Sequence, residues 1–153
     1  MELSLNLAKS HPGSWLNFKT EILIDDALLS NRFCKKDGFS YLSGELMFDG
    51  KEVIVKGQGE LMLDCVCSRC GEEFKYNFIF EFNSAFLDKT DAKDEDEEYY
   101  FKGDSVNIDK AVVDTILINL PSVLICKEDC KGLCPHCFTN LNRFSCNCKN
   151  EDE

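Results

Sequence analysis

The sequence has no long apolar run. Its most apolar stretch, residues 111–126, is interrupted by polar side chains and by Pro121, and it falls short of the roughly 20 residues that span a bilayer. Residues 1–7 alternate apolar and polar side chains, and they lack both the basic start and the apolar centre of a signal peptide. We therefore expect no membrane segment and a cytoplasmic location.

Basic residues and catalytic motifs are also scarce. The chain has 17 Lys and Arg against 28 Asp and Glu, a formal net charge of −11, which disfavours non-specific binding to RNA phosphates. It has only two histidines, His11 and His136, and neither adjoins an identifiable nucleophile. No glycine-rich phosphate-binding motif occurs. The sequence therefore predicts a protein that is not an enzyme.

Cysteine, in contrast, is abundant. The ten cysteines are Cys34, Cys65, Cys67, Cys70, Cys126, Cys130, Cys134, Cys137, Cys146 and Cys148. All but the first fall into two clusters, residues 65–70 and 126–148. In a reducing cytoplasm, clustered cysteines bind metal or do redox work more often than they form structural disulfides.

Alternating apolar residues predict an antiparallel sheet. Residues 1–7, 16–24, 39–48 and 52–63 alternate in this way, and Asp49-Gly50 between the last two predicts a hairpin turn. Gly57 and Gly59 predict a bulge or a tight bend within the fourth run. The clearest strand is residues 74–82. Its core face is expected to consist of Phe74, Tyr76, Phe78, Phe80 and Phe82.

Two further segments follow the predicted sheet. Residues 88–104 contain eight acidic and three basic residues and predict a solvated, mobile loop. A helix is then expected, with Asp109 as its N-cap and Pro121 as its stop signal. Its apolar stripe is Val112, Val113, Ile116, Leu117 and Leu120, which we expect to pack on the sheet.

Together these segments predict an α+β fold. We expect an antiparallel sheet, open or barrel-like, with one packed helix and a C-terminal zinc-binding, cysteine-rich tail. Residues 1–130 would form the sheet-and-helix domain, with the acidic loop at 88–104, and residues 131–153 would form a zinc knuckle.

The cysteine spacing predicts two zinc sites of four thiolates each. Two closely spaced thiolates on a tight turn can occupy adjacent corners of a tetrahedron about 2.3 Å from zinc. We favour one site formed by Cys67, Cys70, Cys126 and Cys130, and a second formed by Cys134, Cys137, Cys146 and Cys148. A rival partition joins Cys126, Cys130, Cys134 and Cys137 and leaves Cys67 and Cys70 for the last pair. The sequence does not exclude iron as the metal.

The remaining thiols are expected to be structural. Cys34 and Cys65 are interpreted as ordinary buried residues, because small thiols are among the most buried side chains. A lesser alternative puts Cys65 in place of Cys67 as a ligand. His136 lies between two ligands and is expected to point away from the metal, and Arg69 is expected to bond thiolate sulfur or to contact a partner.

The cysteine-rich tail resembles that of a known family. Residues 126–137, followed by Asn140-Leu-Asn142 and Cys146-Asn-Cys148, are similar to the YceD family, a bacterial and plastid family of large-subunit ribosomal RNA accumulation proteins. The turn at residues 67–70 and the helix before Pro121 stand where the family has them. Phe138 is a departure, because the family usually has Gly there. The resemblance favours our first partition of the cysteines over the rival one.

The resemblance implies a role in ribosome assembly without catalysis. Because the chain is acidic, we expect basic ribosomal or assembly proteins as partners rather than RNA. The tail still offers a small basic patch for direct RNA contact, formed by Lys127, Lys131, Arg143 and Lys149. The alternative function is a thiol-based redox or metal-handling switch that releases zinc on oxidation. The oligomeric state is left open.

Overall fold

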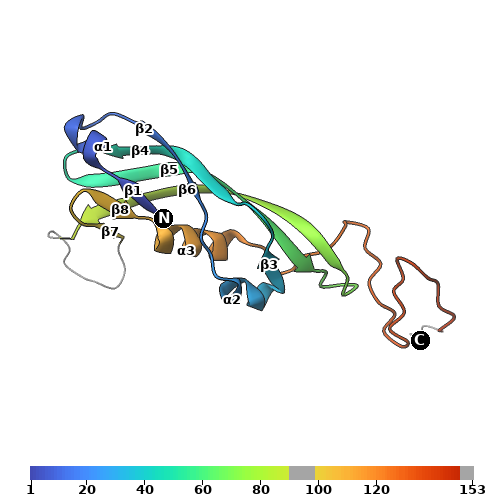
Figure 1. Cartoon of the computed structure of the whole chain (residues 1–153). Coiled ribbons are helices and arrows are strands. Elements are labelled where there is room, and N and C mark those ends of the chain that lie inside the picture. Colours follow the sequence, from blue (N-terminus) through green and yellow to red (C-terminus); the bar gives the residue numbers. More distant parts are fainter. Residues whose placement is uncertain (90–98, 149–153) are drawn as a thin grey trace.

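The computed structural model describes residues 1–89 and 99–148, which form an open sheet, a few helices and an extended C-terminal segment (Figure 1). Strand order in the main sheet is β2 (Leu16–Glu21), β4 (Tyr41–Phe48), β5 (Glu52–Val66), β6 (Glu73–Asp88) and β7 (Tyr100–Phe101). β3 (Cys34–Lys36) pairs with β5 near its C-terminal end. All pairings are antiparallel except β6 with β7. The α+β prediction is confirmed, and the sheet is open rather than closed into a barrel.

The β4–β5 hairpin turns where the sequence predicted. The Asp49 carboxylate accepts the backbone N–H groups of Lys51 and Glu52, both at 2.8 Å. Gly50 has φ +104°, a conformation that residues with a side chain rarely adopt. Turn chemistry and strand pattern therefore agree here, which is why this hairpin could be recognised from the sequence.

The glycines of β5 do not form the predicted bulge. Pairing of β5 with both β4 and β6 continues through them without interruption. Gly57 instead lies opposite Gly44, where a Cβ on either would collide with the facing backbone. Gly59 leaves room for the ring of Phe80 on β6. The glycines permit close packing rather than a bend.

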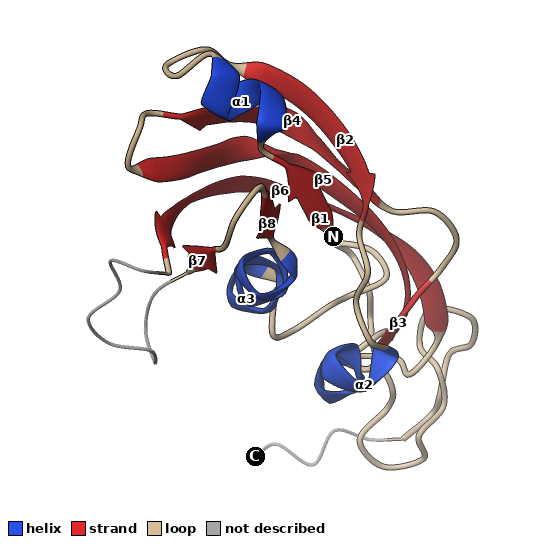
Figure 2. Cartoon of the chain, turned by 60° about the vertical axis from the view of Figure 1, so that its left-hand side comes forward, coloured by secondary structure: helices blue, strands red, loops and turns tan. Residues whose placement is uncertain are grey.

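The aromatic face of β6 forms the core as expected. Phe78, Phe80 and Phe82 are buried, while Phe74 and Tyr76 towards the hairpin tip are half-buried. The helix α3 (Asp109–Asn119) lies against the concave side of the curved sheet (Figure 2). It buries Ala111, Val112 and Ile116, and Leu120 just beyond it is buried too. The predicted packing of helix on sheet is confirmed.

The ends of α3 differ slightly from the prediction. Ile108 is the N-cap, and Asp109 is the first helical residue, whose N–H is accepted by the Asn107 side chain at 2.8 Å. The Asp109 carboxylate is instead paired with the terminal amine of Met1. At the other end Leu120 is extended, as the following Pro121 requires.

The N-terminal run is only partly a strand. β1 (Glu2–Ser4) pairs with β8 (Ser105–Asn107), and α1 (Asn6–Ser10) begins soon afterwards. Leu7 therefore leaves the apolar face and is exposed. Two short elements that the sequence analysis did not predict, α2 (Asp26–Leu29) and the 3-10 turn η1 (Ser30–Arg32), precede β3.

The segment predicted as an acidic loop has structured ends. Asp88 belongs to β6, Tyr100 and Phe101 form β7, and Phe101 is buried. The prediction of a solvated loop was wrong at these ends, because the charges around them obscured two aromatic residues that pair with the sheet. The middle of the loop, residues 90–98, lies outside the described residues.

No helix within the described ranges is long and apolar enough to cross a membrane. The predicted division of the chain after residue 130 stays a prediction.

Candidate metal centres

Four cysteines from two distant segments meet beyond the end of the main sheet. Cys67 and Cys70 lie in the turn between β5 and β6, and Cys126 and Cys130 lie in the segment after α3. Their sulfurs all lie within 4.8 Å of one another, with Cys67 to Cys130 at 3.8 Å and Cys70 to Cys126 at 3.7 Å. Four sulfurs about 2.3 Å from a tetrahedral zinc ion are about 3.8 Å apart. This first group therefore fits a zinc ion.

The first cysteine turn, residues 67–72, is shaped by its backbone. The N–H of Cys67 is accepted by the Glu72 carbonyl at 2.8 Å, and the N–H of Gly71 by the Cys67 carbonyl at 2.9 Å. Gly71 has φ +70°, so glycine suits this position. The N–H of Arg69 points at the Cys67 sulfur at 3.4 Å. The turn thus presents both sulfurs to the same side.

The segment after α3 is fastened to this turn. The Leu124 carbonyl accepts the N–H of Ser68 at 2.8 Å, and the N–H of Cys126 is directed at the Cys67 sulfur at 3.4 Å. The Arg69 guanidinium donates to the Cys130 carbonyl at 3.2 Å. Arg69 therefore bonds sulfur through its backbone and carbonyl oxygen through its side chain.

The surroundings of the first group favour partial ionisation of its thiols. Burial alone raises the pKa of Cys67, but the N–H groups of Cys126, Cys70 and Arg69 outweigh it and lower this pKa to about 6. Burial and the neighbouring sulfurs raise the pKa of Cys126 to about 12. Four clustered thiolates would repel one another. All four thiols would therefore ionise together only with a cation bound among them.

A second group lies entirely within the tail. It consists of Cys134, Cys137, Cys146 and Cys148, whose sulfurs again lie within 4.8 Å of one another. The second cysteine turn, residues 134–139, repeats the bonds of the first: the Thr139 carbonyl accepts the N–H of Cys134, and the Cys134 carbonyl accepts the N–H of Phe138, both at 2.9 Å. Cys137 and Cys148 are exposed.

The thiols of the second group also differ widely in pKa. The hydroxyl oxygen of Thr139 lies 3.1 Å from the Cys137 sulfur, and Thr139 lowers the pKa of Cys137 to about 6. The Cys137 sulfur and burial raise the pKa of Cys148 to about 12. The donor set, four sulfurs with no other ligand type, suits zinc here too.

Asn142 links the tail to the first group, a role that the sequence analysis missed. Its amide N–H points at the Cys130 sulfur at 3.4 Å, and its amide oxygen accepts the N–H of Lys131 at 2.9 Å. The Asn140 side chain in turn accepts the N–H of Asn142 at 2.9 Å. The only sequence signal was the place of both asparagines in the family-like tail pattern.

The structure brings the eight cysteines together in the partition that the sequence analysis favoured. The rival partition is not formed, and Cys65 does not replace Cys67. Neither His11 nor His136 belongs to either group, and both are exposed. Three members of the expected basic patch can be located, whereas Lys149 lies outside the described residues.

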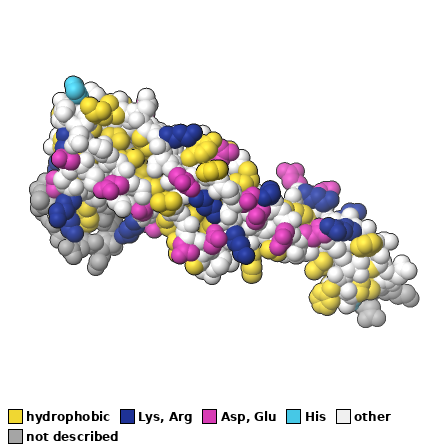
Figure 3. Space-filling model, in the orientation of Figure 1, with side chains coloured by type: hydrophobic (Ala, Val, Ile, Leu, Met, Phe, Trp, Pro, Cys, Tyr) yellow, Lys and Arg dark blue, Asp and Glu magenta, His cyan; other side chains and the backbone are white. Residues whose placement is uncertain are grey.

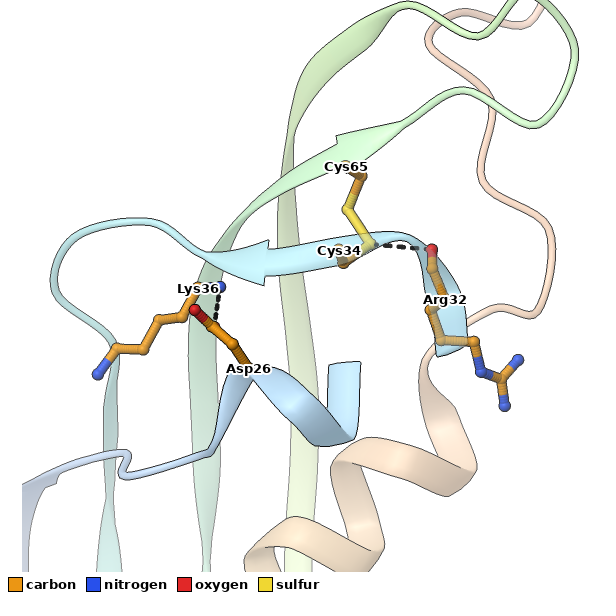
Figure 4. Close-up of a disulfide and its surroundings, with 5 residues drawn as sticks. All are labelled: Asp26, Arg32, Cys34, Lys36 and Cys65. Carbon is orange, nitrogen blue, oxygen red and sulfur yellow. Dashed lines mark hydrogen bonds between the residues drawn. A yellow bond between two sulfur atoms is a disulfide. The ribbon is translucent and has the colours of Figure 1, made fainter. Parts of the chain in front are cut away.

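Cys34 and Cys65 are buried as predicted, but they are not free thiols. They form a disulfide between β3 and β5 (Figure 4). The two residues are directly opposite in the antiparallel register, with Cα atoms 4.2 Å apart. The sequence analysis did not anticipate this bond, because the short strand β3, and hence its pairing with β5, was not predicted.

The fold and these two groups define a small α+β protein with two candidate metal centres. A family described as large ribosomal RNA subunit accumulation protein YceD matches residues 55–153, more than half of the chain. The protein therefore belongs to the YceD family. The matched region includes both four-cysteine groups and α3. No curated protein matches the chain, and no solved structure does either.

Proposed function

We propose that this protein is a non-catalytic factor, held together by two Zn²⁺ ions, that supports accumulation of large-subunit ribosomal RNA in the cytoplasm. Membership of the YceD family implies the role in ribosomal RNA accumulation. The observation that carries the rest is the first group, whose sulfur separations of 3.7 and 3.8 Å match a tetrahedral zinc–thiolate site.

The role proposed for the metal is structural. Cys67 and Cys70 on the hairpin, with Cys126 and Cys130 after α3, would hold one ion and so join two segments far apart in sequence. Four protein ligands leave no open position for substrate, unlike a catalytic zinc site. A closed site of this kind contributes on the order of 10 kcal/mol to folding. Such a contribution accounts for the cysteines without any catalytic step.

Protein partners are favoured over RNA by the charges on the tail. Lys127 lies 3.7 Å from Asp129, and Arg143 is paired with Glu72 at 2.7 Å. Two of the three described cations of the basic patch are therefore already neighbours of carboxylates. Since the chain as a whole has a net charge of −11, basic ribosomal or assembly proteins are the expected partners.

The test has two parts. Cells lacking the protein should show a lower ratio of large- to small-subunit ribosomal RNA, restored by the natural chain but not by C67S/C70S. A pull-down with the natural chain should recover basic ribosomal or assembly proteins. An unchanged RNA ratio would contradict the role, and recovery of naked RNA alone would contradict the preference for protein partners.

One observation favours the alternative function, a thiol switch. Cys137 and Cys148 of the second group are exposed, so an oxidant can reach them. Counting reactive thiols in the native protein, with and without peroxide, separates the two functions. Structural sites should give few reactive thiols and no metal loss. For a switch, peroxide treatment should lower both the bound metal and the number of reactive thiols.

A further inference from the structure

A pocket of about 610 Å³ lies where α2, β3 and the end of β5 meet, close to the first cysteine turn. Its apolar lining includes Phe33, Val66 and the Cys34–Cys65 disulfide. Its polar lining includes the carboxylates of Asp26, Asp64 and Glu73. We call this the α2–β3 pocket. It shares no residue with either cysteine group.

Phe33 is an exposed aromatic residue on a fixed backbone. Its side chain is 71% exposed, and its φ of +54° is unusual for a bulky residue. Its N–H is nevertheless accepted by the Ser30 carbonyl at 2.9 Å, and its carbonyl accepts the N–H of Val66, also at 2.9 Å. A large, exposed apolar side chain on a hydrogen-bonded backbone is a typical contact residue for a partner.

The charges of the α2–β3 pocket are mostly negative. Its lining contains these three acidic residues and one basic residue, Lys35. Asp26 accepts the N–H of Lys36 at 2.8 Å (Figure 4), and Asp64 pairs with Lys75 at 3.0 Å. Glu73 has no ion-pair partner among the described residues. The pocket lining therefore offers an entering cation both a carboxylate without an ion pair and an aromatic ring.

We propose that the α2–β3 pocket binds an arginine-bearing segment of a basic protein partner. The inference rests on the proposed function, because it supplies the contact for the expected partner. Arginine suits the site best, since its guanidinium stacks on an aromatic ring and pairs with carboxylates through several donors. Its aliphatic stem would cover Val66 and the disulfide.

Other occupants are disfavoured by charge. The chain's own segments 90–98 and 149–153 carry net negative charge in sequence and would be repelled. A second copy brings a further net charge of −11. An RNA strand would place phosphates against Asp26, Asp64 and Glu73. Lys and Arg side chains are interspersed with Asp and Glu side chains over the face shown in Figure 3, so no broad positive surface competes there for RNA.

The first metal centre supports this pocket. Val66 and Glu73 form the last cross-strand pair of β5 and β6, directly below the first cysteine turn. A metal ion that orders the turn would therefore also fix the separation of these two pocket residues. We expect metal removal to weaken binding at the pocket as well as to loosen the hairpin.

The experiment uses the full zinc-loaded chain and, as probe, a fluorescein-labelled peptide of alternating arginine and leucine, followed by anisotropy. E73Q should weaken binding about fivefold or more, whereas the control E81Q on the same strand should change it less than about twofold. F33A should weaken binding as strongly, while the control F39A, also at an exposed Phe, should not. Thermal melts of all four variants check that the fold is kept.

Three outcomes would overturn the inference. If E73Q and E81Q weaken peptide binding equally, the peptide is attracted by net charge alone. If F33A and F39A change binding equally, Phe33 makes no specific contact with the peptide. Displacement of the peptide by single-stranded RNA, with E73Q tightening RNA binding, would assign the pocket to RNA. Failure of the ribosomal RNA test with intact peptide binding would overturn the proposed function only, so the two failures are distinguishable.

Discussion

The two cysteine turns have the same backbone bonds but different surroundings. In both, the first cysteine donates its N–H to the carbonyl five residues on, and its own carbonyl accepts the N–H four residues on. The residue after the second cysteine has positive φ in both, +70° at Gly71 and +57° at Phe138. The first turn caps the longest hairpin of the sheet, whereas the second closes a loop within the tail.

Their burial differs accordingly. Cys67, Cys70 and Cys130 of the first group are 2%, 4% and 4% exposed, whereas in the second group only Cys134 is buried. The first group also joins segments that are 56 residues or more apart, while the second joins neighbours. The comparison teaches that the same turn geometry can join distant segments in one place and close only a short loop in another.

The largest expected effect is on stability. C67S/C70S should lower the free energy of unfolding of the sheet by on the order of 10 kcal/mol, because the contribution of a structural zinc site is lost. C134S/C137S should lower it by less than about 1 kcal/mol, since its group lies outside the sheet. Urea unfolding followed by Trp15 fluorescence measures both. Equal losses would remove the distinction between the two groups.

Thiol reactivity in the metal-free protein should separate members of one group. The pKa of Cys137 is about 6 and that of Cys148 about 12, so at pH 7.5 only Cys137 is largely ionised. Cys137 should react with iodoacetamide about a hundredfold faster, because only the thiolate attacks. Its rate should fall as the pH drops through about 6. Mass spectrometry of timed digests reads this out, and similar rates at the two sites would contradict it.

Zinc should leave the second group first. Its exposed sulfurs admit a chelator, whereas the first group is mostly buried. Release to a coloured chelator should show two phases of equal amplitude, with rates about tenfold or more apart. The C146S/C148S variant should lack the fast phase and keep the slow one. A single phase, or loss of the slow phase in that variant, would show that burial does not set the order.

The smallest expected effect concerns the positive φ positions. F138G should strengthen zinc binding at the second group by about fivefold, because a residue with a side chain costs about 1 kcal/mol in this conformation. G71A should weaken the first group by a similar factor, since its Cβ meets no atom within 4 Å and only backbone strain acts. Competition with a zinc-binding dye measures both, and changes of the same sign would contradict this account.

Local patterns made part of this molecule predictable. The Asp49-Gly50 turn and the alternating aromatics of β6 each carry their own signal, since turn chemistry and strand period depend on adjacent residues. The cysteine pairs were equally easy to recognise, although their spacing alone left open two ways of dividing them between the sites. The family resemblance favoured the one that the structure forms.

Contacts between distant segments could not be predicted from the sequence. The pairing of β3 with β5 depends on the whole sheet, so the disulfide between Cys34 and Cys65 had no local signal. Phe101 was obscured by the acidic residues around it, and the change from strand to helix after Leu5 broke an apparently regular alternation. The role of Asn142 could be seen only once the structure placed its amide beside the Cys130 sulfur.

The most direct test is the zinc content per chain of protein purified without added metal. We expect two zinc ions, with the same single ion lost in C67S/C70S and in C126S/C130S, and the other lost in C134S/C137S and in C146S/C148S. A folded protein with far less than one zinc ion would contradict the structural role of the metal. Loss of the same ion from C126S/C130S and C134S/C137S would contradict the partition.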